Sequence, residues 1–234
     1  RTYITTGMQP VDNMLGGGLQ GGFLIGVSGA SKAGKTQFTL QCLATAADYH
    51  GNAVYVETEP NRFDIERVKS LTRKEDSYQR IHKIEAWSAD EEIDNLKLQR
   101  NAYDAIKDTF DNVALVVVDS FIANFRLSGF DGRADLPERN SVVANHLEGL
   151  QSLSNTFDCP VLLTLQVQGN PDQYSGGDYS LWGPVLMDHT ITYLLHMSHA
   201  KGELRSIEMK GNPSMGDGSV TIKIPENSPL EAVE

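Results

Sequence analysis

One short segment of the chain carries the residues that most plainly predict chemistry. Residues 29–36 read Gly-Ala-Ser-Lys-Ala-Gly-Lys-Thr and follow the apolar run of residues 23–27. The pattern Gly-x-x-x-x-Gly-Lys-Thr, after a buried strand and before a helix, predicts a loop whose backbone N–H groups surround phosphate oxygens. Lys35 would reach the β- and γ-phosphates, and the Thr36 hydroxyl would bind Mg²⁺. The expected nucleotide-binding set is Gly29, Ala30, Ser31, Lys32, Ala33, Gly34, Lys35 and Thr36.

Two acidic positions could supply the metal ligand and the group that acts on water. Asp119 ends the apolar run of residues 114–118. Because open α/β sheets bind ligands at the carboxyl ends of their strands, we expect Asp119 beside the loop as the magnesium partner. Glu59 follows a second apolar run and is predicted to orient or deprotonate the attacking water. Glu57, two residues earlier, is its nearest competitor.

Composition excludes some classes of function. The net charge of −11 over 234 residues argues against a surface that binds nucleic acid everywhere, so any DNA contact must be local. The longest purely apolar run, residues 113–118, is far too short to span a bilayer, and no signal peptide is visible. Cys42 and Cys159 are expected to be buried thiols of a reducing compartment. We expect a soluble protein that makes no membrane contact. It is expected to be cytoplasmic and associated with the nucleoid, or nuclear if its source is eukaryotic.

Strand patterns alternate with helix patterns along most of the chain. Alternation of this kind predicts an α/β fold with a mostly parallel sheet covered by helices, and the last strands predict an antiparallel extension. Pro137 suits a first helical turn and Asp135 a helix cap. The expected helices cover residues 36–49, 62–72, 89–109 and 137–157. The expected strands cover residues 23–27, 53–57, 81–87, 114–119, 161–167, 191–197, 204–210 and 220–224.

These motifs together resemble the RecA/RadA recombinase family. The resemblance covers nearly the whole chain in order, and it implies a RecA-like P-loop ATPase core. It rests on "TGMQPVDNMLGGGL", "GKTQ", "ETEPNRFDIER", "LVVVDSFIANFR", "GRADLPERNSVVANHLEGLQSL", "VLLTLQVQGNPD" and "WGPVLMDHTITYLLHM". We expect residues 1–234 to form one such core domain without the family's amino-terminal domain, and the absence of an initiator Met suggests that an upstream segment was removed.

The resemblance implies roles for further residues. It makes Glu59 the catalytic base, Gln166 the sensor of the γ-phosphate and Gln37 part of the nucleotide-binding set. Arg67 is the expected adenine contact, although one additional residue in this segment makes Arg62 a rival. The family's head-to-tail assembly with ATP between protomers would use Lys210 as a cation acting on the neighbour's nucleotide and Pro213 near its adenine; a solvated Lys210 is the alternative.

The resemblance also implies two DNA loops, whose composition departs from what a phosphate surface needs. Arg126 and Arg133 belong to the first, in which Arg and acidic residues balance, and residues 167–184 of the second contain no Lys or Arg. Tyr179 and Trp182 could instead stack on unpaired bases, or pack against their own domain.

Three functions follow from these features. The first is a DNA-dependent ATPase of homologous recombination and repair that binds single-stranded DNA and assembles with itself. The second is a mediator or paralogue, like archaeal RadB, that binds ATP and a RecA/RadA-family partner with weak hydrolysis. The third is a KaiC-like signalling ATPase, which leaves the later motifs unexplained. A metal site at His196 and His199 is not expected, since strand residues three apart point to opposite faces.

Overall fold

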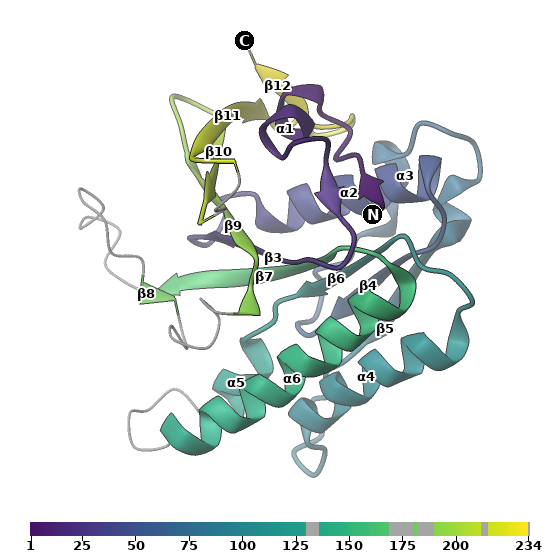
Figure 1. Ribbon diagram of the computed structural model, residues 1–234, viewed down its shortest axis with the longest axis vertical. Coiled ribbons are helices and arrows are strands. Elements are labelled where there is room, and N and C mark those ends of the chain that lie inside the picture. Colours follow the sequence, from purple (N-terminus) through teal and green to yellow (C-terminus); the bar gives the residue numbers. More distant parts are fainter. Residues whose placement is uncertain (130–135, 169–179, 182–189, 212–214, 234) are drawn as a thin grey trace.

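A mixed β-sheet of ten strands forms the centre of the protein (Figure 1). The computed structural model describes residues 1–129, 136–168, 180–181, 190–211 and 215–233. The strands of this sheet are β3 (Leu24–Gly29), β4 (Ala53–Glu57), β5 (Ile81–Glu85), β6 (Leu115–Asp119), β7 (Val161–Gln168), β8 (Ser180–Leu181), β9 (Tyr193–His199), β10 (Arg205–Lys210), β11 (Gly218–Lys223) and β12 (Glu231–Val233).

The strand order is β12-β11-β10-β9-β3-β7-β6-β4-β5, and β8 pairs with β7 outside this path. Strands β9, β3, β7, β6, β4 and β5 run parallel to one another. Strands β10, β11 and β12 continue the sheet in antiparallel pairing. Both the predicted fold class and the predicted antiparallel extension are therefore confirmed. Strand β3, which leads into the predicted phosphate-binding loop, lies inside the sheet with β7 on one side and β9 on the other.

Helices cover both faces of the parallel strands, as Figure 1 shows. One face carries α2 (Lys35–Tyr49), α3 (Ile65–Leu71) and the 3₁₀ turn η1 (Ser77–Arg80); the other carries α4 (Asn95–Thr109), α5 (Ala123–Leu127) and α6 (Leu136–Phe157). The side chains of β6 alternate between the two faces of the sheet. Leu115 and Val117 belong to one apolar core, and Val116 and Val118 belong to the other. A strand buried on both faces reads as a continuous aliphatic run.

Aspartate side chains fix where two helices begin. Asp64 accepts hydrogen bonds from the backbone N–H groups of the second and third residues of α3, and Asp94 does the same for α4. Helix α4 therefore starts at residue 95, and the predicted start at residue 89 was wrong. Ile93, two residues before the helix begins, is 44% exposed. Pro137 lies in the first turn of α6 as predicted, whereas Asp135 lies outside the described residues.

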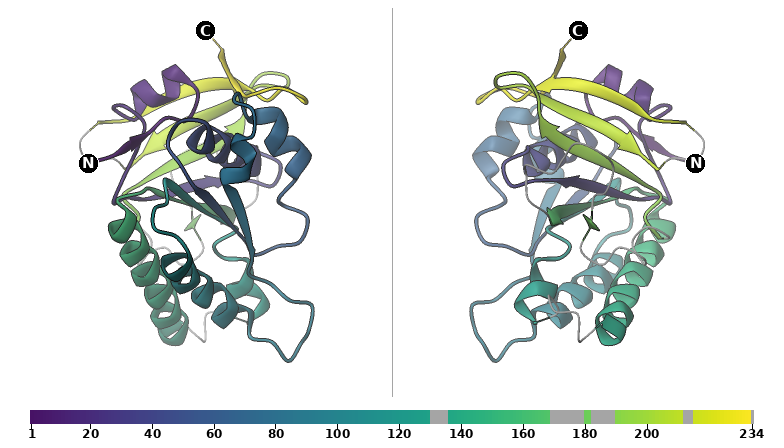
Figure 2. Two further views of the ribbon diagram at one scale, coloured as in Figure 1. Left: turned by 90° about the vertical axis from the view of Figure 1, so that its right-hand side faces the viewer. Right: turned by 90° about the vertical axis from the view of Figure 1, so that its left-hand side faces the viewer.

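The amino-terminal segment has structure that the sequence patterns did not predict. It forms β1 (Tyr3–Ile4), α1 (Gln9–Met14) and β2 (Leu19–Gln20), and α1 packs against β11 and β12 (Figure 2). Gln41 of α2 joins both ends of the chain: its Nε2 donates to the Thr6 carbonyl at 3.4 Å, and its Oε1 accepts from the Leu230 N–H at 3.1 Å.

Both cysteines are buried thiols, as predicted. Burial raises the pKa of Cys42 well above its usual range and that of Cys159 to about 12, so both remain protonated at neutral pH. Within the described part of the chain, no helix combines the length and the apolar character that a membrane crossing needs.

Candidate nucleotide-binding site

The phosphate-binding loop joins the end of β3 to the start of α2. Gly34, the residue before α2, has a φ of 101°, and a Cβ there would lie 2.8 Å from Ile224 Cδ1. A Cβ on Gly29 would lie only 2.5 Å from the Met197 carbonyl oxygen of β9. Lys32 has a φ of 64°, which glycine adopts more readily than lysine. The loop thus has a residue in the left-handed conformation, as glycine-rich loops often do, but that residue is Lys32 and not glycine.

Lys35 lies at the first position of α2 and points back over the loop. Its Nζ donates to the carbonyl oxygens of Gly29 and Ala30, both at 2.8 Å. Burial lowers the pKa of the ammonium, and the nearby Asp119 carboxylate opposes that shift. The chain therefore holds a partly desolvated cation over the loop, where it can interact strongly with phosphate oxygens.

Asp119 ends β6 and is 4% exposed. Its Oδ2 accepts from Thr36 Oγ1 at 2.7 Å and from the Tyr55 hydroxyl at 2.5 Å, and its Oδ1 accepts from Thr164 Oγ1 at 2.7 Å. Burial and the adjacent carboxylate raise the pKa of Tyr55 far above its usual value, so this hydroxyl stays a donor. The Thr36 hydroxyl and the Asp119 carboxylate meet at one point and are the oxygen donors that Mg²⁺ prefers.

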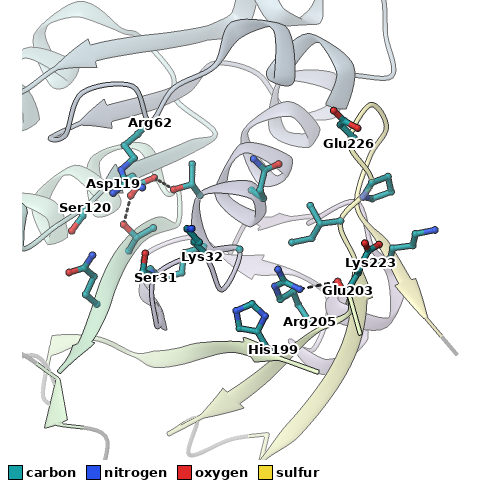
Figure 3. A pocket seen from close by; sticks show the side chains of 18 of the residues that line it. Ser31, Lys32, Arg62, Asp119, Ser120, His199, Glu203, Arg205, Lys223 and Glu226 are labelled. Atoms are coloured by element: carbon teal, nitrogen blue, oxygen red, sulfur yellow. Dashed lines mark hydrogen bonds between the residues drawn. The ribbon is translucent and has the colours of Figure 1, made fainter. Parts of the chain in front are cut away.

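A cavity of about 1060 Å³ surrounds these groups. Figure 3 shows Asp119, Ser120 and Arg62 on one side of the loop, with His199, Glu203, Arg205 and Lys223 on the other. Of the predicted site residues, the cavity brings together Ser31, Lys32, Gly34, Lys35, Thr36, Gln37, Glu59, Asp119 and Gln166.

Glu59 lines this cavity and is held by an arginine. Its Oε2 accepts from both Nε and Nη2 of Arg62 at 2.8 Å, and the two side chains are 28% and 45% exposed. Glu57, by contrast, is 3% exposed, accepts from the Phe63 N–H at 2.9 Å and does not line the cavity. Through this bond, Glu57 supports the segment that carries Glu59.

Gln166 reaches the loop through strand pairing, because it is paired with Gly29 across β7 and β3. Its Oε1 accepts from Arg126 Nη1 at 2.5 Å. Arg126 lies on α5, the short helix that follows Asp119 and Ser120. The side chain predicted to sense the γ-phosphate is thus held by Arg126, which the resemblance assigned to the first DNA loop.

The two arginines considered for adenine occupy different places. Arg62 lines the phosphate cavity, whereas Arg67 lines an adjoining cavity of about 410 Å³ with Gln37 and Pro225. Arg67 is 9% exposed; it donates to Gln37 Oε1 at 2.7 Å and to the carbonyls of Glu226 and Ser228 at 3.0 Å. Much of its hydrogen-bonding capacity therefore fastens the carboxy-terminal segment to α2 and α3.

Several lining residues were missed by the sequence reasoning. Thr164, His199, Arg205 and Lys223 come from β7, from the β9–β10 hairpin and from β11, and no local motif marks them. The pairing of Gly29 with Met197 across β3 and β9 brings the hairpin to the loop. His199 lines the cavity, while His196 is buried with its Nδ1 3.0 Å from Ser28 Oγ.

Five other predicted residues lie away from the cavity or beyond the described part of the chain. Lys210 ends β10, and its Nζ lies 3.5 Å from Glu208 Oε2. Arg133, Tyr179, Trp182 and Pro213 lie outside the described residues. Their roles stay predictions.

Comparison with known protein families agrees with the fold. The family model described as Rad51 matches residues 2–230 of this chain, which include the phosphate loop, Glu59, Asp119 and Gln166.

Proposed function

This chain belongs to the Rad51 family of RecA/RadA recombinases, whose members are ATPases of recombination and DNA repair, and on that premise we propose that it binds and hydrolyses ATP in a DNA-dependent manner. One observation carries the proposal: Lys35, the hydrogen-bonded pair Thr36 and Asp119, and the side chains of Glu59 and Gln166 line one cavity.

Each of these residues has a distinct task in the proposed reaction. The loop N–H groups and Lys35 hold the phosphates. Thr36 and Asp119 hold Mg²⁺, which when bound neutralises charge on the β- and γ-phosphates. Glu59 orients the attacking water and Gln166 contacts the γ-phosphate. ATP and water then give ADP, hydrogen phosphate and a proton.

The same proposal extends to DNA and to assembly. Single-stranded DNA is the proposed polymer ligand, with Arg126, Arg133, Tyr179 and Trp182 as contacts. Protomers stack head to tail, and Lys210 and Pro213 of one protomer reach the nucleotide of the next. Family membership supports these roles in general, and the residues named are our assignment.

A mediator with weak hydrolysis is the second candidate. Two features favour it: both hydrolysis residues, Glu59 and Gln166, are hydrogen-bonded to arginines, and the net charge is −11. Such a protein would bind ATP and a partner of the RecA/RadA family. The family match gives no support to a signalling ATPase.

The deciding experiment measures ATP turnover with and without single-stranded DNA over a range of salt concentrations. A recombinase shows strong stimulation that falls as salt rises, because DNA binding releases counterions. A mediator shows no stimulation by DNA and responds to a partner recombinase instead.

The binding site is tested with Lys35→Ala and with Lys97→Ala, which removes an exposed lysine of α4, as its matched control. Loss of the charge-assisted bonds to two phosphates should weaken ATP binding by at least about 100-fold. Titration of a fluorescent ATP analogue measures this. Unchanged affinity in Lys35→Ala would show that the nucleotide binds elsewhere.

A further inference from the structure

A second cavity of about 570 Å³ adjoins the phosphate cavity. The same side chains separate the two, since Glu59, Arg62, Ser120 and Gln166 line both. Leu127, which is 74% exposed, lines the second cavity, so this cavity reaches the molecular surface. A group that passed between these shared side chains would therefore reach the outside of the protein.

Two guanidinium groups line this second cavity, from Arg62 and Arg126. They are the same groups that hold Glu59 and Gln166. Neutral donors add to them, because Asn61, Ser88 and Asn95 also line the cavity. Glu59 is the only carboxylate among its described lining residues, and it is already paired. The described lining is thus net positive and rich in donors, which suits a small oxyanion.

We propose that the second cavity is the exit route for inorganic phosphate, with Arg62 and Arg126 as the residues that receive it. The inference rests on the proposed ATPase function. After water attacks the γ-phosphorus and the bond to the β–γ bridging oxygen breaks, ADP remains at the phosphate loop. The hydrogen phosphate dianion is left at the end of the cavity bounded by Glu59 and Gln166, which are also the border of the second cavity.

The energies of the existing contacts permit this transfer. An ion pair as exposed as that of Arg62 and Glu59 is weak and exchanges partners easily. The bond from Arg126 to Gln166 joins a cation to a neutral amide, and a dianion offers the same guanidinium a stronger acceptor. Phosphate that enters the second cavity therefore takes both arginines from their partners. When phosphate leaves, both contacts form again and return Glu59 and Gln166 to their starting positions.

A charge series at Leu127 tests the route without touching the hydrolysis residues. Leu127→Glu and Leu127→Lys are compared with the neutral Leu127→Gln in the ADP-bound protein. Equilibrium dialysis with labelled inorganic phosphate measures affinity and requires no turnover. We expect phosphate affinity to fall about fivefold in Leu127→Glu and to rise about fivefold in Leu127→Lys, relative to Leu127→Gln. Equal affinity across the series would overturn the proposal.

Variants of the receiving arginines give the second measurement. Arg126→Gln should weaken phosphate binding to the ADP complex about tenfold, and Arg126→Lys should restore part of that loss. Arg73→Gln, which removes an exposed arginine that lines neither cavity, should leave it unchanged. In single turnovers, a phosphate sensor should show release lagging behind cleavage in Arg126→Gln, with cleavage followed by chemical quench.

The outcomes separate this inference from its premise. Absence of ATP hydrolysis in the unmodified protein would overturn the ATPase proposal, while the dialysis series would still decide whether the second cavity binds phosphate. Unchanged phosphate affinity in Arg126→Gln, with loss of binding to a single-stranded oligonucleotide, would overturn the exit route and assign the cavity to nucleic-acid phosphodiesters.

Discussion

The two halves of the phosphate cavity are held together differently. Around Asp119, three hydroxyl groups meet a carboxylate that is 4% exposed, and two of the donors come from neighbouring strands. Around Glu59 and Gln166, the contacts are to arginines on irregular or short segments, and the Glu59 pair is exposed to solvent. Buried hydrogen bonds are expensive to break, whereas exposed ion pairs exchange partners easily. We infer that the half around Asp119 is fixed and that the half around Glu59 and Gln166 is movable.

The largest effect that separates the two halves is expected for Glu59→Gln. Loss of the proposed base should lower ATP turnover by about 10²–10⁴-fold, whereas nucleotide affinity, which should depend on the fixed half, should change only a few-fold. Steady-state turnover and ATP titration measure the two quantities. Glu57→Gln is the matched control and should mainly reduce stability, because Glu57 is buried and accepts from Phe63. The assignment fails if Glu57→Gln loses turnover while Glu59→Gln keeps it.

Acid should destabilise the movable half, because protonation of His146 disturbs the packing of α5. This residue is 2% exposed and contacts Tyr103 and Phe125, so it supports α5, which carries Arg126. Burial lowers the pKa of His146 to about 4. The positive charge of Arg100 contributes to this lowering of the pKa, and the negative charge of Asp94 opposes the shift. Because the unfolded state binds this proton near pH 6.5, stability is full above that pH and is lost as pH falls toward 4, by about 3 kcal/mol.

Urea unfolding between pH 4 and 7 measures this effect, with His146→Gln as the comparison. The variant should have a flatter profile over that range. A smaller dependence of the unfolding free energy on pH should remain in both proteins, because burial also lowers the pKa values of His50, His82 and His196. Identical profiles would assign the acid sensitivity to those other histidines.

A pair of conservative variants compares the halves directly. Tyr55→Phe removes one donor to the buried Asp119 and should destabilise the protein by about 1 kcal/mol. Arg62→Gln breaks the exposed pair and should change the free energy of unfolding by less than about 0.5 kcal/mol. Urea unfolding at neutral pH provides both values. Equal losses would remove the distinction between a fixed half and a movable half.

Among the smallest effects is that expected for Lys32→Gly, in the phosphate-binding loop. Glycine relieves the left-handed strain at this position but adds flexibility to the unfolded chain, so Lys32→Gly should alter stability by less than about 0.5 kcal/mol. Lys32→Val, with a β-branched side chain at the same φ, should destabilise the protein by about 1–2 kcal/mol. Thermal unfolding ranks the two, and the reverse order would mean that the loop changes shape to accommodate its side chain.

The sequence predicts the fixed half better than the movable one. The phosphate loop and the aliphatic strand before Asp119 are local patterns, and each forces a strand end or a helix start. Tyr55 and Thr164 escaped prediction because their contact with Asp119 depends on strand order. Glu59 was predicted from its position after a strand, but its pairing with Arg62 depends on the turn between them. Helix α4 was predicted six residues too early because acidic residues before Asp94 resemble a first helical turn.

Gln41 gives the fold a mechanical property. One amide on the phosphate-loop helix fastens backbone near residue 6 and near residue 230, so tension applied at either end of the chain is transmitted to α2. A pull on the segment near residue 6 or near residue 230 therefore acts on α2 through Gln41, and a pull on the carboxy-terminal segment also acts through Arg67. In an optical trap, a load on the ends should change how long nucleotide stays bound before any strand of the sheet separates.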